Sequence, residues 1–204
     1  LTFPTFLTMR TVWSGPDYSH GYLVLGLTVM LVVSELRRGS LAPAAPSWAG
    51  LACLAGLALV LMAARATSTQ SVELLAMPLT WVAVTWAWAG WQNARRLVLP
   101  LSYLLVANPL WDVFVEPLRK LTVVVVSMWI RIADMPAFIE GNLIHVPSGT
   151  FEVMGGCAGL RYALVALALA VFTGLFSYRR WQPTAVLVLS ALALVAIGNW
   201  LRVF

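Results

Sequence analysis

The chain has 204 residues, of which 61% are hydrophobic and only 10% are charged, with a mean hydropathy of +0.86. A soluble domain carries roughly 25% charged residues, so this composition excludes a water-soluble globule, a disordered chain and a collagen-like repeat. The net charge of +5 does not indicate a nucleic-acid partner, because most basic residues come in pairs between apolar runs, as in the cytoplasmic loops of multi-spanning proteins. We therefore expect an integral membrane protein surrounded by lipid.

Apolar stretches long enough to cross a bilayer, which takes about 20 residues, occur along the whole chain. They lie at residues 18–36, 47–64, 72–91, 97–115, 160–178 and 184–201. Residues 118–133 form a weaker stretch, which contains Arg119, Lys120 and Arg131 and whose apolar residues recur at helical spacing. We expect this stretch to be an interfacial or re-entrant helix and not a further span.

Basic pairs predict which ends of these spans face the cytoplasm. Three pairs fall on one side if residues 118–133 do not cross the membrane: Arg37-Arg38, Arg95-Arg96 and Arg179-Arg180. The segment 136–157 and Arg202 then lie on the outer face, and so does the Arg119-Lys120 pair, which counts mildly against this arrangement.

The segment 136–157 is the one stretch that does not resemble a membrane helix. Residues 142–146 and 150–153 favour β-strands, and their side chains would alternate between the two faces of a short hairpin. Between them lies Pro147-Ser148-Gly149, whose residues are typical of a turn. We therefore expect an all-α integral membrane fold: a single polytopic domain over residues 1–204, built as a multi-pass helical bundle with a short extracytoplasmic β-hairpin and an interfacial helix.

Cys157 has the sequence surroundings of a reactive thiol. A helix that begins here would place its free N–H groups and dipole at the sulfur, where they stabilise a thiolate. Arg161 would follow one turn later on the same face, and Gly155, Gly156 and Gly159 would let a substrate chain approach closely. The alternative is a buried, unreactive thiol beside an arginine that extends to the membrane surface.

Arg202 ends the last apolar stretch, on the same predicted side as Cys157. There its guanidinium could stabilise an oxyanion or a leaving group at the cysteine, or it could simply anchor the helix at the interface. His20 and His145 could act as bases, but no spacing places either beside Cys157. The cysteines, histidines and carboxylates show no metal-ligand spacing, so we expect no metal and no cofactor.

Several motifs, in order over nearly the whole chain, are similar to those of one family. They are Tyr18-Ser-His-Gly21, Pro109-Leu-Trp111, Glu116-Pro-Leu118, Gly141-Asn-Leu-Ile-His-Val-Pro147, Phe151-Glu-Val153, Gly156-Cys-Ala-Gly-Leu-Arg-Tyr162 and Asn199-Trp-Leu-Arg-Val-Phe204. With these motifs the chain resembles the exosortases, multi-pass bacterial transpeptidases related to the archaeosortases, and most closely the exosortase A type that is associated with exopolysaccharide loci.

The resemblance implies roles for three residues. Cys157 matches the nucleophile that forms an acyl-thioester, Arg202 matches the basic residue assigned as proton donor, and Arg161 of the cysteine motif is supportive. The family's third catalytic position is a histidine on a following segment, which neither His20 nor His145 matches. We therefore expect a C-terminally truncated chain that is inactive alone.

The resemblance also implies a substrate and a location. Exosortases process exported proteins that end in a Pro-Glu-Pro motif, an apolar helix and a basic tail, so we expect a multi-pass protein of the bacterial inner membrane with its site on the periplasmic face. Two alternatives remain open from the residues. One is a non-catalytic membrane subunit of a polysaccharide export or transport system, and the other is an acyltransferase that forms a thioester with a lipid donor.

Overall fold

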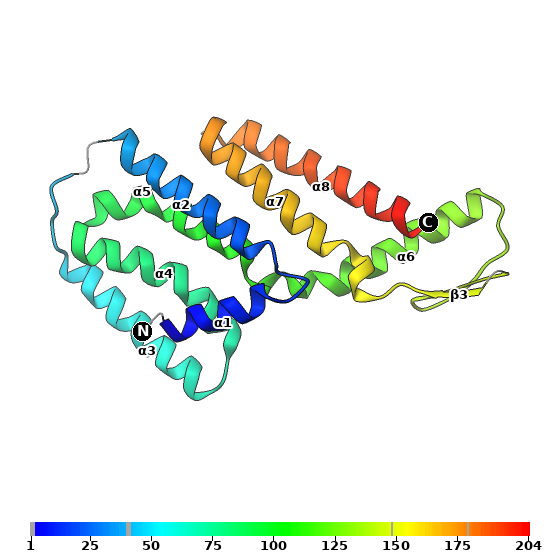
Figure 1. The fold of residues 1–204 in the computed structure, drawn as a ribbon, viewed down its shortest axis with the longest axis horizontal. Coiled ribbons are helices and arrows are strands. Elements are labelled where there is room, and N and C mark those ends of the chain that lie inside the picture. Colours follow the sequence, from blue (N-terminus) through cyan, green and yellow to red (C-terminus); the bar gives the residue numbers. More distant parts are fainter. Residues whose placement is uncertain (1–2, 40–41, 148, 179) are drawn as a thin grey trace. The chain divides into compact units, whose positions relative to one another are not determined.

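A computed structural model of the chain describes residues 3–39, 42–147, 149–178 and 180–204, with the side chains described from residue 7 onward (Figure 1). Within these ranges the chain separates into two compact units, Leu1–Leu110 and Trp111–Phe204. Arg179 and Ser148, which belong to an expected basic pair and to the expected turn, lie outside the described residues.

Helices joined by turns and irregular segments make up the described residues of the first unit. Its elements are α1 (Phe3–Trp13), α2 (Gly21–Arg38), α3 (Trp48–Ala66), α4 (Gln70–Ala89), α5 (Trp91–Ser102) and the 3-10 helix η1 (Tyr103–Ala107). The helices α3 and α4 are adjacent in sequence and pack against each other. They approach closely at Gly50, where a Cβ atom would lie 2.5 Å from the backbone nitrogen of Ala87.

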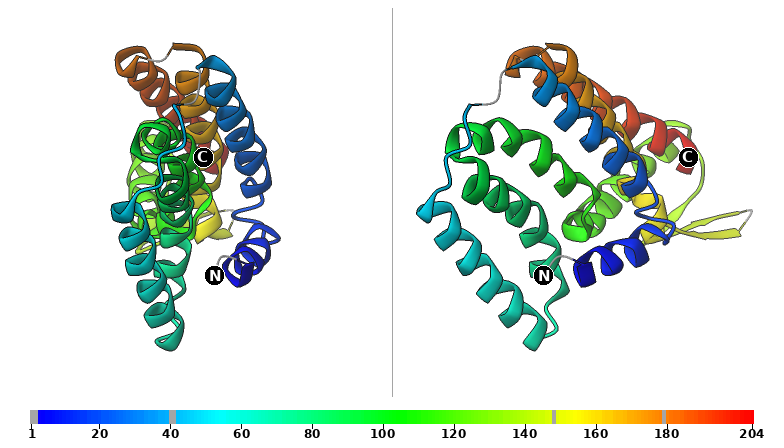
Figure 2. Two further views of the ribbon diagram at one scale, coloured as in Figure 1. Left: turned by 90° about the vertical axis from the view of Figure 1, so that its left-hand side faces the viewer. Right: turned by 60° about the vertical axis from the view of Figure 1, so that its left-hand side comes forward.

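The second unit combines helices with a small sheet. It begins within η2 (Pro109–Phe114), whose first two residues belong to the first unit. Its other elements are α6 (Val115–Ile132), β1 (Phe138–Glu140), β2 (Leu143–Val146), β3 (Gly149–Glu152), η3 (Gly155–Ala158), α7 (Leu160–Thr173), the π-helical turn η4 (Gly174–Tyr178) and α8 (Trp181–Val203). The strands pair antiparallel in the order β1-β2-β3. Figures 1 and 2 show α7 and α8 side by side. In the order of the chain, the three strands follow α6 and precede η3.

The core of the second unit joins the sheet to α6. Val123, Val126 and Ile130 of α6 pack against Ile144 of β2 and against Val153, the residue that follows β3. Partly buried side chains surround this cluster, namely Ile139, Val146, Cys157 and Val203. Burial of these apolar side chains is the main stabilising contribution here, and it places Cys157 at the edge of a packed core.

The structure confirms the expected fold class. Among the described residues, four helices are long and apolar enough to cross a membrane: Trp48–Ala66, Gln70–Ala89, Leu160–Tyr178 and Trp181–Val203. They correspond to four of the expected stretches. A fifth crossing results if Trp91–Ala107 and Pro109–Ile132 are taken together as one broken span. The expected hairpin is present as β2 and β3, and β1 adds a strand that the sequence did not predict.

The expected stretch at 97–115 is not one helix. Asn108 is extended, with φ −96° and ψ 147°, and it separates η1 from η2. The following Pro109 disfavours a helical conformation at Asn108, and the buried Asn108 side chain donates from Nδ2 to the carbonyl oxygen of Leu74 at 2.9 Å. The helix that we expected at 118–133 begins earlier, at Val115, and its Arg119 pairs with Glu116, which neutralises one of the basic charges predicted on the outer face.

The α3–α4 contact predicts a difference between two glycines of the same helix. Gly50→Ala should lower the free energy of unfolding by about 1–3 kcal/mol, because the helices must separate to admit the methyl group. Gly56→Ala, where a Cβ atom would meet nothing within 4 Å, should be neutral or slightly stabilising. Thermal unfolding in detergent micelles measures both, and equal midpoints for the two variants would contradict the packing described.

Candidate functional site

Cys157 lies in a short turn between the sheet and α7. The turn is the 3-10 helix η3, in which the backbone nitrogen of Cys157 donates to the carbonyl oxygen of Met154 at 2.9 Å. Gly159 then adopts a left-handed conformation, with φ +79°, and α7 begins at Leu160. The expectation of one helix that begins at Cys157 is therefore wrong, because Gly159 interrupts the helical path between the cysteine and α7.

This interruption also separates Cys157 from Arg161. The two residues would share a helix face only if the chain between them were continuously helical. Arg161 instead lies exposed in the first turn of α7. It does not line the cavity at the cysteine that is described below.

Asn199 of α8 holds the cysteine turn. Its side chain is 5% exposed, and its Nδ2 donates to the carbonyl oxygen of Cys157 at 2.8 Å. It also packs on Gly159, where a Cβ atom would lie 2.8 Å from the Asn199 Cγ. The Oδ1 of Asn199 is buried and has no hydrogen-bond partner within the described part of the chain. This role of Asn199 was not predicted from the sequence. An amide near the end of an apolar helix is nevertheless a signal for it, because the amide needs a hydrogen-bond partner there.

Arg202 lies one helical turn after Asn199 and faces the same turn of the chain. Its Nη1 donates to the Tyr162 hydroxyl at 3.1 Å, and its Nη2 donates to the carbonyl oxygen of Gly156 at 3.5 Å. The guanidinium carbon is 5.3 Å from the centroid of the Tyr162 ring, within the range of a cation–π contact. The guanidinium therefore lies beside the residue that precedes Cys157.

Cys157 and Arg202 line one cavity of about 840 Å³. Its walls come from α6, the strands and the end of α8, and they include Ile130, Phe151, Glu152, Val153 and Phe204. The end of α8 is fixed on α6 by Trp129, whose ring meets those of Trp200 and Phe204 edge to face at centroid distances of 6.5 and 5.9 Å. The arrangement gives a partly buried thiol and a cation access to the same space.

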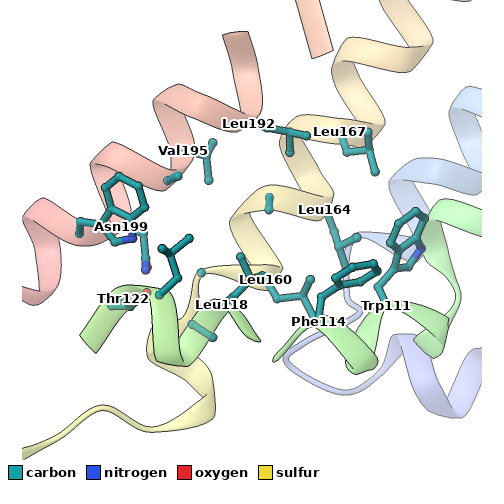
Figure 3. Close-up of a pocket in the computed structure, with 16 residues that line it drawn as sticks. Trp111, Phe114, Leu118, Thr122, Leu160, Leu164, Leu167, Leu192, Val195 and Asn199 are labelled. Atoms are coloured by element: carbon teal, nitrogen blue, oxygen red, sulfur yellow. The ribbon is translucent and has the colours of Figure 1, made fainter. Parts of the chain in front are cut away.

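A second, apolar pocket of about 310 Å³ lies between α6, α7 and α8. Figure 3 shows Asn199 and Thr122 at one end of it and Trp111 and Phe114 at the other. The remaining labelled side chains are aliphatic: Leu118, Leu160, Leu164, Leu167, Leu192 and Val195. The boundary between the two hollows runs through the cysteine turn, because Cys157 lines the first whereas Ala158 and Gly159 line the second.

The histidines are placed elsewhere. His145 lies on β2, with its Nδ1 2.9 Å from the Thr150 Oγ1 and its ring 5.9 Å from that of Phe138, so it is a strand-face residue. His20 belongs to the first unit, where it is 7% exposed and its ring centroid lies 5.6 Å from that of Tyr18. The described residues contain no group of three or more histidine, cysteine or acidic side chains that could hold a metal ion.

Comparison with known protein families identifies a related family. A family model described as transmembrane exosortase (Exosortase_EpsH) matches residues 12–204 of the chain. The matched range contains Cys157, Arg161, Asn199 and Arg202. Neither a curated protein nor a solved structure matches the chain.

The geometry of the cysteine turn predicts that its two flanking glycines tolerate substitution differently. Gly159→Ala should lower the free energy of unfolding by at least about 1–2 kcal/mol, because a left-handed conformation disfavours a Cβ atom and this one would also collide with Asn199. Gly156→Ala should be tolerated, since a Cβ atom there meets nothing within 4 Å. Thermal unfolding combined with maleimide labelling of Cys157 in a Cys53→Ala background tests this, and similar midpoints and labelling rates for both variants would refute it.

Proposed function

Because the chain belongs to the transmembrane exosortase family, we propose that it is a cysteine transpeptidase that cleaves C-terminal sorting signals of the Pro-Glu-Pro type from exported proteins. The observation that carries this proposal is the shared cavity of Cys157 and Arg202, at the point where the sheet meets α7 and α8. A cysteine peptidase needs its nucleophile and a group that stabilises developing charge at one place, and we assign these roles to Cys157 and Arg202.

The reaction begins with attack of the Cys157 sulfur on a substrate carbonyl carbon. The thiol gives up its proton as a carbon–sulfur bond forms, and the carbonyl oxygen becomes negatively charged. The carbonyl then re-forms as the carbon–nitrogen bond breaks, and the leaving amine takes up the proton that the thiol lost. The product is an acyl-thioester. An amine or water attacks the thioester carbonyl in turn and releases the Cys157 sulfur, so the first acceptor gives transpeptidation and the second gives hydrolysis.

Arg202 serves in this proposal as the electrostatic group. The resemblance assigns it as a proton donor, but a guanidinium keeps its protons in proteins, so stabilisation of the oxyanion is the chemically better role. Its contacts with Tyr162 and the Gly156 carbonyl oxygen hold it beside the cysteine before substrate arrives. Arg161, which lies outside the cavity, has a supporting role at most.

The two hollows suit the parts of a sorting signal. The motif to be cleaved would occupy the cavity at Cys157, and the adjoining apolar pocket would receive side chains of the apolar helix that follows the motif. We place this site on the periplasmic face of the bacterial inner membrane, where the basic pairs put the segment 136–157.

Replacement of the two cysteines should have opposite outcomes. Cys157→Ala in the full-length protein should reduce processing of a sorting-signal reporter by at least about 10³-fold, because the sulfur that forms the thioester is removed. Cys53→Ala should leave processing unchanged, since Cys53 is exposed on α3 in the first unit. Reporter size in cells, followed by immunoblotting, measures both.

The same experiment separates the alternatives. Normal processing in the Cys157→Ala strain would exclude Cys157 as the nucleophile and would favour a non-catalytic subunit. A Cys157 adduct that contains lipid and no peptide would instead identify an acyltransferase.

Replacement of the two arginines tests the role of Arg202. Arg202→Gln should lower the rate constant of acylation by about 10²–10³-fold with little change in substrate affinity, because its charge acts mainly in the transition state. Arg161→Gln should cost less than about tenfold, since its side chain lies outside the cavity. Single-turnover cleavage of a reporter peptide by the purified full-length protein gives the rate constant of acylation and the substrate affinity of each variant. Equal decreases of the acylation rate constant in the two variants would contradict the role assigned to Arg202.

A further inference from the structure

Strand β3 leaves an open edge next to the candidate site. Within the described residues it is the last strand of the sheet, with the order β1-β2-β3, and all four of its residues are exposed. Its free edge presents backbone N–H and C=O groups that a further extended chain can bind. The chain passes from β3 through Val153 and Met154 directly into the turn that carries Cys157.

The register identifies which backbone groups face outward. The nitrogen of Val153 donates to the carbonyl oxygen of Asn142 at 2.9 Å, so the backbone groups of Val153 point toward β2. In an antiparallel pair the direction alternates along the strand, and Glu152 and Thr150 therefore point away from β2. The carbonyl oxygen of Glu152 already accepts from the nitrogen of Met154 at 3.1 Å, so the groups offered to a further strand are the N–H of Glu152 and both backbone groups of Thr150. The side chain of Thr150 supports this register, since it lies 2.9 Å from that of the directly opposite His145, as in a close non-hydrogen-bonded pair.

The open edge is continuous with the cavity that Cys157 and Arg202 line. Phe151 and Glu152 of β3 line the same cavity of about 840 Å³ as Cys157 and Arg202. A chain paired with β3 would thus extend into the cavity without leaving the edge. Strand β3 has only four residues, so pairing with it alone would give a weak contact. A peptide that also fills the cavity would gain further contacts, and we therefore favour a peptide as the partner of this edge over a second copy of the chain.

We propose that the substrate's extended sorting motif adds to β3 as a fourth strand, through hydrogen bonds with the N–H and C=O groups of Thr150 and the N–H of Glu152. This pairing delivers the scissile carbonyl to Cys157. The inference rests on the proposed function and extends it to the mode of substrate binding. A Pro-Glu-Pro sequence is compatible with such pairing, because residues two apart point the same way along a strand. Both proline nitrogens, which lack a proton, would face away from β3, and the glutamate N–H would face it.

The test measures binding separately from catalysis. A fluorescent peptide that contains Pro-Glu-Pro is titrated, by fluorescence anisotropy, into the full-length Cys157→Ala protein in lipid nanodiscs. Methylation of the glutamate nitrogen should weaken binding by about tenfold, because one inter-strand hydrogen bond is lost. Methylation of the nitrogen three residues after the glutamate, which points away from β3, is the matched control and should change the dissociation constant less than about twofold.

A protein variant gives the reciprocal measurement. Thr150→Pro removes an outward N–H while the hydrogen bonds between β2 and β3 stay available, and it should weaken binding of the unmodified peptide by about tenfold. Circular dichroism and thermal unfolding check that this variant is folded. Should it misfold, the pair of methylated peptides still decides the matter on the Cys157→Ala protein.

The outcomes distinguish this inference from the proposed function. Equal binding of the two methylated peptides would overturn strand addition, even if the active protein processes its substrate. A protein dimer that Thr150→Pro dissociates would overturn it as well, because the edge would then belong to a second copy. Strand addition with the expected methylation effect, but without cleavage by the protein that retains Cys157, would uphold the binding mode and remove the catalytic proposal.

Discussion

The hydrogen bond from Asn199 to the carbonyl oxygen of Cys157 is the constraint on which the candidate site depends. It joins an irregular turn to a regular helix, at 2.8 Å, and it is made by a side chain that is 5% exposed. The left-handed Gly159 makes the contact possible, because any larger residue would collide with the asparagine. Loss of a buried bond of this kind typically costs about 1–3 kcal/mol, since the remaining polar group is left unsatisfied.

The position of Arg202 follows from the same contact. Because Arg202 is three residues after Asn199 in α8, the bond that fixes the asparagine also fixes the rotation of the helix end. The edge-to-face contacts of Trp129 with Trp200 and Phe204 add a second restraint from α6. The thiol and the guanidinium therefore share a cavity through helix packing.

The sequence predicted the features that are encoded locally. Apolar runs located the long helices, and the β-prone segments around Pro147 located β2 and β3. The cysteine motif and the final arginine gave the two residues that line the cavity. The break at Asn108, by contrast, depends in part on a bond to the carbonyl oxygen of Leu74, far away in sequence, which no local pattern contains.

The remaining differences also have tertiary causes. Strand β1 has only three residues and pairs with β2, so its own sequence gives little signal. The left-handed state of Gly159 is one of several that glycine adopts freely, and the close approach of Asn199 makes it necessary here. That conformation places Arg161 outside the cavity, which the expectation of a continuous helix could not anticipate.

The most direct test of the account is the mass of the protein after reaction with a sorting-signal peptide. The full-length protein is mixed with the peptide, quenched in acid within seconds and digested, and the fragment that contains Cys157 is analysed by mass spectrometry. We expect a hydroxylamine-sensitive adduct on Cys157 whose added mass equals that of the N-terminal part of the cleaved peptide less one water, as a thioester requires. Cleavage of the peptide with no adduct on Cys157 at any time before the peptide is consumed would contradict the account.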